Sequence, residues 1–373
     1  MIYYDNSATT KPSISCLEQA QKFNTELFYN PSTLYHGGLS VKEEINASKE
    51  YILKCLGATN HEITFTSCGT ESNNTAIFCA VKRGVFLTDN GEHASVYNSF
   101  LTLKNKGLQT VFIDLNNDGL VDTEKLFDYV KNNEVDFVSI VHVNNETGAI
   151  NDVNYIAKVI KSINKNVIFH VDGVQAFGKL TYRLSNEIDL YSISSHKING
   201  LKGTGALIRR KGLNLSPLII GGGQENNLRS GTENVFGIKV FEYATKLHYE
   251  NLKENYEKVK EIKEYITTNI DKSIFTVISG ENSIPYILSV SANGLKGEVV
   301  MHSLELKDII VGNGSACSAR NKYSRVIKSC GYKDDVLSGV IRLSFGIENT
   351  LDEAKYAVSI INETAKKLKG IMC

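Results

Sequence analysis

The stretch VDFVSIVHVNNETGAINDVNYIAKVIKSINKNVIFHVD, residues 135–172, contains two apolar runs of strand length separated by an amphipathic segment. The runs are VDFVSIVHV (135–143) and NVIFHVD (166–172). Between them, VNYIAKVIKSIN (153–164) repeats its apolar residues at helical spacing. Two strands that are connected through a helix run parallel in one sheet. This stretch therefore predicts an α/β fold.

The same alternation continues on both sides of this stretch. A second amphipathic segment, VDTEKLFDYVKNN, occupies residues 121–133. Strands that alternate with helices predict a large, mostly parallel sheet with helices on both faces, and ligands then bind at the carboxyl ends of the strands. The other runs of strand length are EITFTS (62–67), GVFLTD (84–89), TVFIDL (110–115), DLYSISS (189–195) and GALIRR (205–210).

The pattern changes after residue 233. Residues 235–270 are predicted to form one long helix, and an apolar run follows at 283–292. A last helix, over about residues 351–369, opens with a capping box formed by Thr350 and Glu353. We expect a large sheet domain and a smaller α+β domain, with the long helix as the hinge between them: residues 12–235 form the large domain, and residues 1–11 and 236–373 form the small one.

Composition excludes several classes of protein. The 373 residues include 41 Lys and Arg and 41 Asp and Glu, so no basic bias points to nucleic acid or to an anionic membrane. No apolar run approaches the roughly 18 residues that a membrane helix needs. The first residues, MIYYDNSATT, do not resemble a signal peptide, so a cytoplasmic protein is expected. The seven cysteines are odd in number and lack CxxC spacing, which fits neither a disulfide framework nor a zinc site.

Three predicted strand ends carry chemically active residues. NVIFHVD ends on Asp172, which either caps a helix or partners a buried cation. DLYSISS is followed by Lys197 among serines and glycines, which suits a Schiff-base lysine or one that binds an anion. After EITFTS, Gly69 and Thr70 would begin a helix whose N–H groups could hold an anion, although they also fit a plain helix start. A lysine, a carboxylate and a phosphate seat together are typical of a pyridoxal-phosphate site.

The sequence also contains VGNGSACSARN (311–321), small polar residues around Cys317. Free cysteine is usually buried, so a cysteine among small polar residues needs an explanation. Read alone, however, this segment predicts no more than an exposed thiol.

These motifs together resemble the cysteine desulfurases, which are pyridoxal-phosphate enzymes of fold type I in the class V aminotransferase group. The resemblance runs nearly end to end, and the lysine, cysteine and arginine segments occur in the family's order. It is carried by IYYDNSATT (2–10), YNPSTLYH (29–36), ITFTSCGTESNN (63–74), EHASV (92–96), HVNNETGAI (142–150), FHVDGVQAFGK (169–179), SSHKINGLKGTGAL (194–207), GGGQENNLRSGTEN (221–234), GSACSA (314–319) and GVIRLSFG (339–346).

The resemblance implies a role for each matching residue. Lys197 would hold pyridoxal 5'-phosphate and move protons at the substrate α-carbon. Asp172 would pair with the pyridine nitrogen, Gln175 would bond the phenolic oxygen, and His93 would stack on the ring and act in acid–base steps. The cofactor phosphate would be held by Gly69, Thr70, Ser194 and His196, with Thr232 reaching in from the second subunit of a homodimer.

Substrate and partner roles follow from the same resemblance. Asn145 and Arg342 would clamp the carboxylate of L-cysteine. Cys317 would be the nucleophile that takes the sulfur as a persulfide, leaving L-alanine, and then passes it to an acceptor protein. The gap of 25 residues from Cys317 to Arg342 resembles the long-loop branch of the family, whose acceptors are iron–sulfur scaffolds or tRNA-thiolating enzymes. Neither a metal nor direct nucleic-acid binding is expected.

Some positions depart from the family pattern, namely Cys68 and Leu201 near the cofactor residues, Asn227 in place of a glycine before Arg229, and Leu39. Asn tolerates a positive φ better than most residues, so Asn227 is expected to keep the backbone shape. Two other functions remain open. A selenocysteine lyase or another class V lyase or transaminase would not need Cys317, and a weakly active homologue would mainly bind partners in a sulfur relay.

Overall fold

The computed structural model describes residues 1–313 and 323–372. Its largest sheet has seven strands, of which β8 is antiparallel to its neighbours β2 and β7, and the other neighbouring strands are parallel. The prediction of an α/β fold with a large, mostly parallel sheet is confirmed. The strand order is β2 (His61–Thr66), β8 (Gly205–Arg210), β7 (Leu190–Ser194), β6 (Ile168–Asp172), β5 (Val135–Val141), β3 (Val85–Asp89) and β4 (Gln109–Ile113).

Helices cover both faces of this sheet. The evidence is that consecutive residues of a strand, whose side chains point to opposite faces, pack in different hydrophobic clusters. Phe86 of β3 packs in one cluster and Leu87 in the other. The cluster of Phe86 contains residues of α4 (Gly69–Ala80) and α5 (Ala94–Asn105). The cluster of Leu87 contains residues of α1 (Ile14–Ala20), α3 (His36–Cys55), α6 (Thr123–Asn132), α7 (Val153–Ile163) and α8 (Val235–Glu250).

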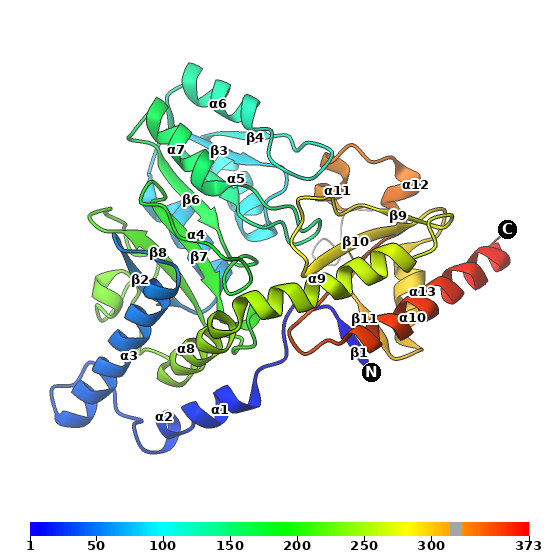
Figure 1. Cartoon of the computed structure of the whole chain (residues 1–373). Helices are drawn as coiled ribbons and strands as arrows, with labels where there is room; N and C mark the ends of the chain where they lie inside the picture. The colour runs from blue at the N-terminus through cyan, green and yellow to red at the C-terminus, as the bar shows by residue number, and fades with distance from the viewer. Residues whose placement is uncertain (314–322, 373) are drawn as a thin grey trace.

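A third cluster forms the core of a smaller α+β unit. It contains β1 (Ile2–Tyr4) and β11 (Ile309–Val311), which pair in parallel, and the antiparallel sheet β12 (Val340–Ser344), β10 (Ile287–Ala292) and β9 (Phe275–Val277). Three helices pack on these strands: α9 (Leu252–Asn269), α10 (Gly297–Glu305) and α13 (Leu351–Met372). The first strand of the chain therefore belongs with the last third of the sequence (Figure 1).

The expectation of one long helix over 235–270 is wrong in one respect. The segment forms two helices, α8 and α9, which meet at Asn251 with φ −117° and ψ 20°. Asparagine disfavours a helix interior, because its side chain competes for backbone hydrogen bonds. The two helices on either side of the break pack in different cores: Phe241 of α8 lies in the large core and Ile262 of α9 lies in the small one. In Figure 1, α9 runs between the two units.

The start of α13 confirms the predicted capping box. The backbone N–H of Thr350 donates to Glu353 Oε2 at 3.1 Å, and the backbone N–H of Glu353 donates to Thr350 Oγ1 at 3.2 Å. Of the helices in residues 1–313 and 323–372, none is long and apolar enough to cross a membrane. The remaining short helices are α2 (Lys22–Thr25), η1 (Ser195–Lys197), η2 (Glu225–Asn227), α11 (Arg325–Ser329) and α12 (Asp334–Leu337).

Candidate active site

A cavity of about 1120 Å³ opens at the carboxyl ends of the central strands. Residues at or just beyond the ends of β5, β6 and β7 line it, as expected for a parallel sheet. Residues of the small unit close it from the other side, including Asp5, Gly312 and Arg342. The cavity thus lies where the two units meet. Of the residues named from the sequence, it brings together Gly69, Thr70, His93, Asn145, Asp172, Gln175, Ser194, His196, Lys197 and Arg342.

Lys197 follows β7 directly, in the short helix η1. Its amine donates to the backbone oxygens of Ser7 and Ala8, at 2.5 and 2.8 Å. The backbone N–H of Ser7 donates to Ser344 Oγ in β12, at 2.8 Å, so strand β12 holds the segment that receives the amine. The amine lies at the edge of the cavity, where it could form a Schiff base with a bound carbonyl group.

Asp172 ends β6 and is 3 % exposed. Its Oδ1 accepts the backbone N–H of Val174 at 3.0 Å, and its Oδ2 accepts Asn73 Nδ2 at 2.8 Å. No helix of the described residues begins here, so the carboxylate supports a turn rather than capping a helix. A buried carboxylate that lines a cavity suits a cationic ring nitrogen.

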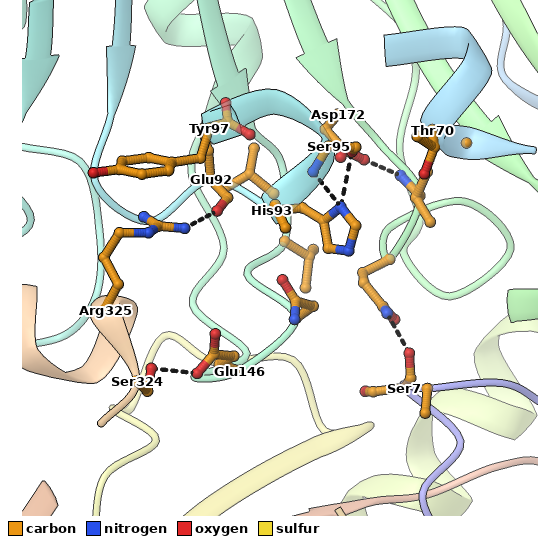
Figure 2. A pocket seen from close by; sticks show the side chains of 18 of the residues that line it. Ser7, Thr70, Glu92, His93, Ser95, Tyr97, Glu146, Asp172, Ser324 and Arg325 are labelled. Atoms are coloured by element: carbon orange, nitrogen blue, oxygen red, sulfur yellow. Dashed lines mark hydrogen bonds between the residues drawn. The ribbon is translucent and has the colours of Figure 1, made fainter. Parts of the chain in front are cut away.

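Asn73 connects Asp172 to His93. Its amide also donates to Ser95 Oγ at 2.8 Å, and Ser95 Oγ lies 2.8 Å from His93 Nδ1. His93 caps helix α5, and its Nδ1 accepts the backbone N–H of Ser95 (Figure 2). The ring proton is therefore assigned to Nε2. Burial lowers the pKa of His93, so the ring is neutral near pH 7.

The first turn of α4 provides an anion seat. Gly69 and Thr70 line the cavity, and no side chain within residues 1–313 and 323–372 caps this helix start. Ser194 Oγ, also at the cavity, is buried and has no hydrogen-bond partner in the part of the chain that the structure describes. His196 lies there with its Nδ1 3.2 Å from Thr9 Oγ1, and burial lowers its pKa to about 3, which keeps it neutral. Unpaired N–H groups and an unpaired buried hydroxyl fit a phosphate group.

Arg342 and Asn145 both line the cavity and are in contact with each other. Arg342 Nη1 donates to the backbone oxygen of Asn145 at 2.8 Å, and Nη2 donates to Asp5 Oδ1 at 2.7 Å. The Nε of Arg342 is buried and has no hydrogen-bond partner among the described residues. Asp5 therefore orients the guanidinium, while Nε retains an unused donor at a cavity that could take a carboxylate.

Arg325, the first residue of α11, connects this helix to the large unit. Its guanidinium lies 3.7 Å from the centre of the Tyr97 ring and donates to the backbone oxygens of Asn90 and Glu92. Next to it, Ser324 Oγ donates to Glu146 Oε2 at 2.5 Å. Figure 2 shows these residues along one side of the cavity. Arg325 attaches α11 to the loop that leads into His93, and Ser324 attaches it to Glu146 in the loop after β5.

Sequence reasoning missed Asn73, Ser95, Asp5 and Arg325. One signal was available: Asn73 lies four residues after Gly69 in one helix, so both face the same direction. The others are brought to the cavity by contacts between distant segments, which no local pattern reports.

Two predicted site residues are not among the described residues that line this cavity. Thr232 is exposed and is not among the described residues that line it. Cys317 lies outside the described residues. Within residues 1–313 and 323–372, no three His, Cys, Asp or Glu side chains are arranged to hold a metal ion.

Among the departures from the family pattern, Asn227 is explained. Its φ is 63°, in the left-handed region that glycine and asparagine tolerate, so the expectation for this residue is confirmed. Cys68 lines the cavity beside the anion seat. Leu201 packs against the large core.

Known proteins resemble the whole chain. The sequence matches the family described as aminotransferase class-V over residues 2–356. It is 36% identical to a "NifS/IcsS protein homolog" of Lactobacillus delbrueckii subsp. bulgaricus, over 97% of each chain. It is 33% identical to "Cysteine desulfurase IscS" of Dictyoglomus turgidum, over 99% of this chain and 96% of that protein.

Solved structures give the same result. The X-ray structure of a NifS-like protein from Rickettsia africae superposes with a TM-score of 0.89, at 31% identity, over 98% of this chain and 99% of that one. A structure titled "SspA in complex with cysteine" superposes with a TM-score of 0.80, at 28% identity, over 92% of this chain and 99% of that one.

Proposed function

This chain belongs to the class-V aminotransferase family, and from that premise we propose that it is a cysteine desulfurase that uses pyridoxal 5'-phosphate. One observation carries the proposal: a lysine amine, a buried carboxylate, an anion seat and an arginine surround a single cavity. Curated relatives that cover nearly the whole chain are named cysteine desulfurases.

The cavity has a fitting residue for each part of the cofactor. Lys197 would bind its carbonyl carbon, Asp172 would hold the proton on its pyridine nitrogen, and His93 would lie against its ring. The helix start at Gly69 and Thr70, with Ser194 and His196, would hold its phosphate. When bound, the cofactor withdraws electrons from the substrate α-carbon. Lys197, once released, would move the proton at that carbon.

L-cysteine is the proposed substrate. The unused Nε of Arg342 and the side chain of Asn145 would bind its carboxylate. One structural relative is titled as a complex with cysteine, which supports this substrate class. The cavity is large enough for the cofactor and a small amino acid together.

Cys317 is the proposed sulfur acceptor within the chain. Its thiolate would form an S–S bond with the substrate sulfur as the C–S bond breaks. The electron pair of the C–S bond stays on the Cβ of the substrate, which takes up a proton and becomes the methyl group of L-alanine. The products are therefore L-alanine and a Cys317 persulfide. The persulfide would then pass its outer sulfur to a thiol of an acceptor protein, for iron–sulfur cluster assembly or tRNA thiolation.

A cytoplasmic homodimer is proposed as the working form. Thr232 is exposed in its own chain, which leaves it available to a second copy. Exposed apolar side chains, Leu218, Ile219 and Ile220, lie shortly before it in sequence. A fully active monomer in light scattering would rule out the role of Thr232.

The proposed function is tested by comparing the wild type with Cys317→Ala and Lys197→Ala. The wild type is expected to be yellow and to release alanine and sulfide from L-cysteine in the presence of a thiol reductant. Cys317→Ala should stay yellow and release almost no sulfide, and Lys197→Ala should lose the yellow Schiff-base absorption. Full sulfide release by Cys317→Ala would instead favour a lyase of the same family that needs no cysteine, such as a selenocysteine lyase.

A further inference from the structure

Lys179 is a buried lysine for which the proposed function gives no role. It follows β6 in the same turn as Gln175 and is 3 % exposed. Its Nζ donates to Gln175 Oε1 at 2.9 Å and lies 5.7 Å from the centre of the Tyr286 ring. Among the described residues, no ion pair is formed with Lys179. A lysine without a carboxylate partner among the described residues is costly to bury and needs an explanation.

The charged groups that influence Lys179 are residues that line the cavity. Burial, and after it the positive charges of Lys197 and Arg342, together lower its pKa to about 7. Asp5 is held by Arg342, and the nearby Tyr286 is a neutral phenol whose pKa burial raises. The amine of Lys179 therefore adds a cation, or at higher pH a neutral donor, next to the site.

The contact with Lys179 fixes the orientation of the Gln175 amide. Gln175 Nε2 donates to the backbone oxygen of Ser7 at 2.9 Å, while Oε1 accepts from Lys179. The Ser7 oxygen can only accept a hydrogen bond and the Lys179 amine, when charged, can only donate one. Both contacts therefore fix the same orientation of the amide. Its second N–H remains for the cavity, which Gln175 lines. A cationic donor on Oε1 also polarises the amide and strengthens that N–H as a donor.

We propose that Lys179 is a positioning residue that acts through Gln175 on the phenolic oxygen of the bound cofactor. The proposal rests on the proposed function and adds a residue to it. The polarised Gln175 amide would stabilise negative charge on that oxygen. The charge on Lys179 would also disfavour a second positive charge on the Lys197 nitrogen. Both effects make the Lys197 nitrogen lose its proton at lower pH.

The test is the pH midpoint of the visible absorption band of the cofactor-loaded protein, together with the dissociation constant of the cofactor. In Lys179→Met the midpoint should rise by about 1 pH unit, and cofactor binding should weaken by about tenfold. Methionine has a similar length and suits the ring of Tyr286, so the variant should fold. Lys179→Gln, which keeps a neutral donor, should shift the midpoint less.

Lys263 provides a matched control. It is a half-buried lysine, burial lowers its pKa to about 8, and its Nζ donates to Ser283 Oγ at 2.6 Å, but it is not among the described residues that line the cavity. Lys263→Met should leave both quantities unchanged. In a Gln175→Ala background, Lys179→Met should cause a smaller shift than in the wild type, because the amide path is absent.

An unchanged midpoint in both Lys179 variants, or an equal shift in Lys263→Met, would overturn the proposal. An equal shift with and without Gln175 would overturn the path through the amide. The proposed function fails separately, if the wild type binds no cofactor or releases no alanine from L-cysteine.

Discussion

At the scale of single residues, Asn73 joins the two groups proposed to contact the cofactor ring. Its amide donates both to Asp172 and to Ser95, which positions His93. We expect Asn73→Ala to lower kcat/KM for L-cysteine by about 10- to 100-fold, since a hydrogen bond to a charged group contributes roughly 1.5–3 kcal/mol. The visible spectrum of the bound cofactor should change as well, because Asp172 loses a donor.

Asn74 is the matched control, because its amide donates to the backbone oxygens of Thr70 and Ser95 instead. Asn74→Ala should retain the wild-type spectrum and most of the activity. Equal losses in the two variants would show that Asn73 has only a structural role.

At the scale of elements, the short helix η2 has an unusual backbone. Glu225, Asn226 and Asn227 have φ values of 49°, 55° and 63°, so three consecutive residues are left-handed. A residue with a Cβ costs roughly 1–2 kcal/mol in this conformation, and asparagine and glycine less. Asn227→Ala should therefore lower the free energy of unfolding by about 1 kcal/mol, while Asn227→Gly should keep or raise it.

Urea unfolding of the two variants measures this difference, with Asn105→Ala on the exposed end of α5 as the control. If Asn227→Gly lowered the free energy of unfolding as much as Asn227→Ala, then contacts of the Asn227 side chain, and not the backbone conformation, would determine its contribution to stability. In that case the substitution of the family's glycine at this position would need another explanation.

The elements also show how far the sequence can be interpreted. Apart from β4 at the edge, which is only partly buried, the strands of the large sheet are mostly buried, and each predicted apolar run overlaps an observed strand. The junction at Asn251 was missed, because apolar spacing continues across it. The pairing of β1 with β11 joins segments separated by about three hundred residues, and no local pattern encodes it. For the same reason the sequence predicted Arg342 but not Asp5, its partner at the cavity.

At the scale of the whole molecule, buried neutral histidines make folding depend on pH. His248 is 2 % exposed, with its ring nitrogens 3.0 Å from the backbone oxygen of Gly178 and 2.8 Å from Asn199 Oδ1. Burial lowers its pKa to about 4. The unfolded chain, with a histidine pKa of about 6.5, therefore binds more protons between these values, so stability is present above pH 6.5 and is lost as the pH falls.

This histidine alone should remove about 2 kcal/mol of stability between about pH 7.5 and about pH 5. In His248→Gln, the decrease in unfolding free energy over that range should be smaller by about this amount. His302→Gln, at an exposed position on α10, should behave as the wild type. An unchanged pH dependence in His248→Gln would mean that this ring does not resist protonation.

The sequence predicts that the molecule consists of two domains, with residues 12–235 in the large one and residues 1–11 and 236–373 in the small one. The separate hydrophobic clusters of the two units support two domains, but α8 packs in the large core and α9 in the small one, so we propose that the boundary lies at the break between them, at Asn251, rather than at residue 235. The proposed cofactor residues come from the large unit, whereas Arg342 and the segment that bears Cys317 come from the small one. Catalysis would therefore depend on the relative position of the large and the small unit at the cavity.

The central claim is that Cys317 takes sulfur from L-cysteine at this cavity. The most direct measurement is the mass of the cofactor-loaded protein after it reacts with L-cysteine without a reductant, combined with peptide mapping and alanine analysis. The account predicts one added sulfur atom per chain, located on Cys317, and one alanine released for each. Alanine release without added sulfur on Cys317, or added sulfur that persists in Cys317→Ala, would contradict it.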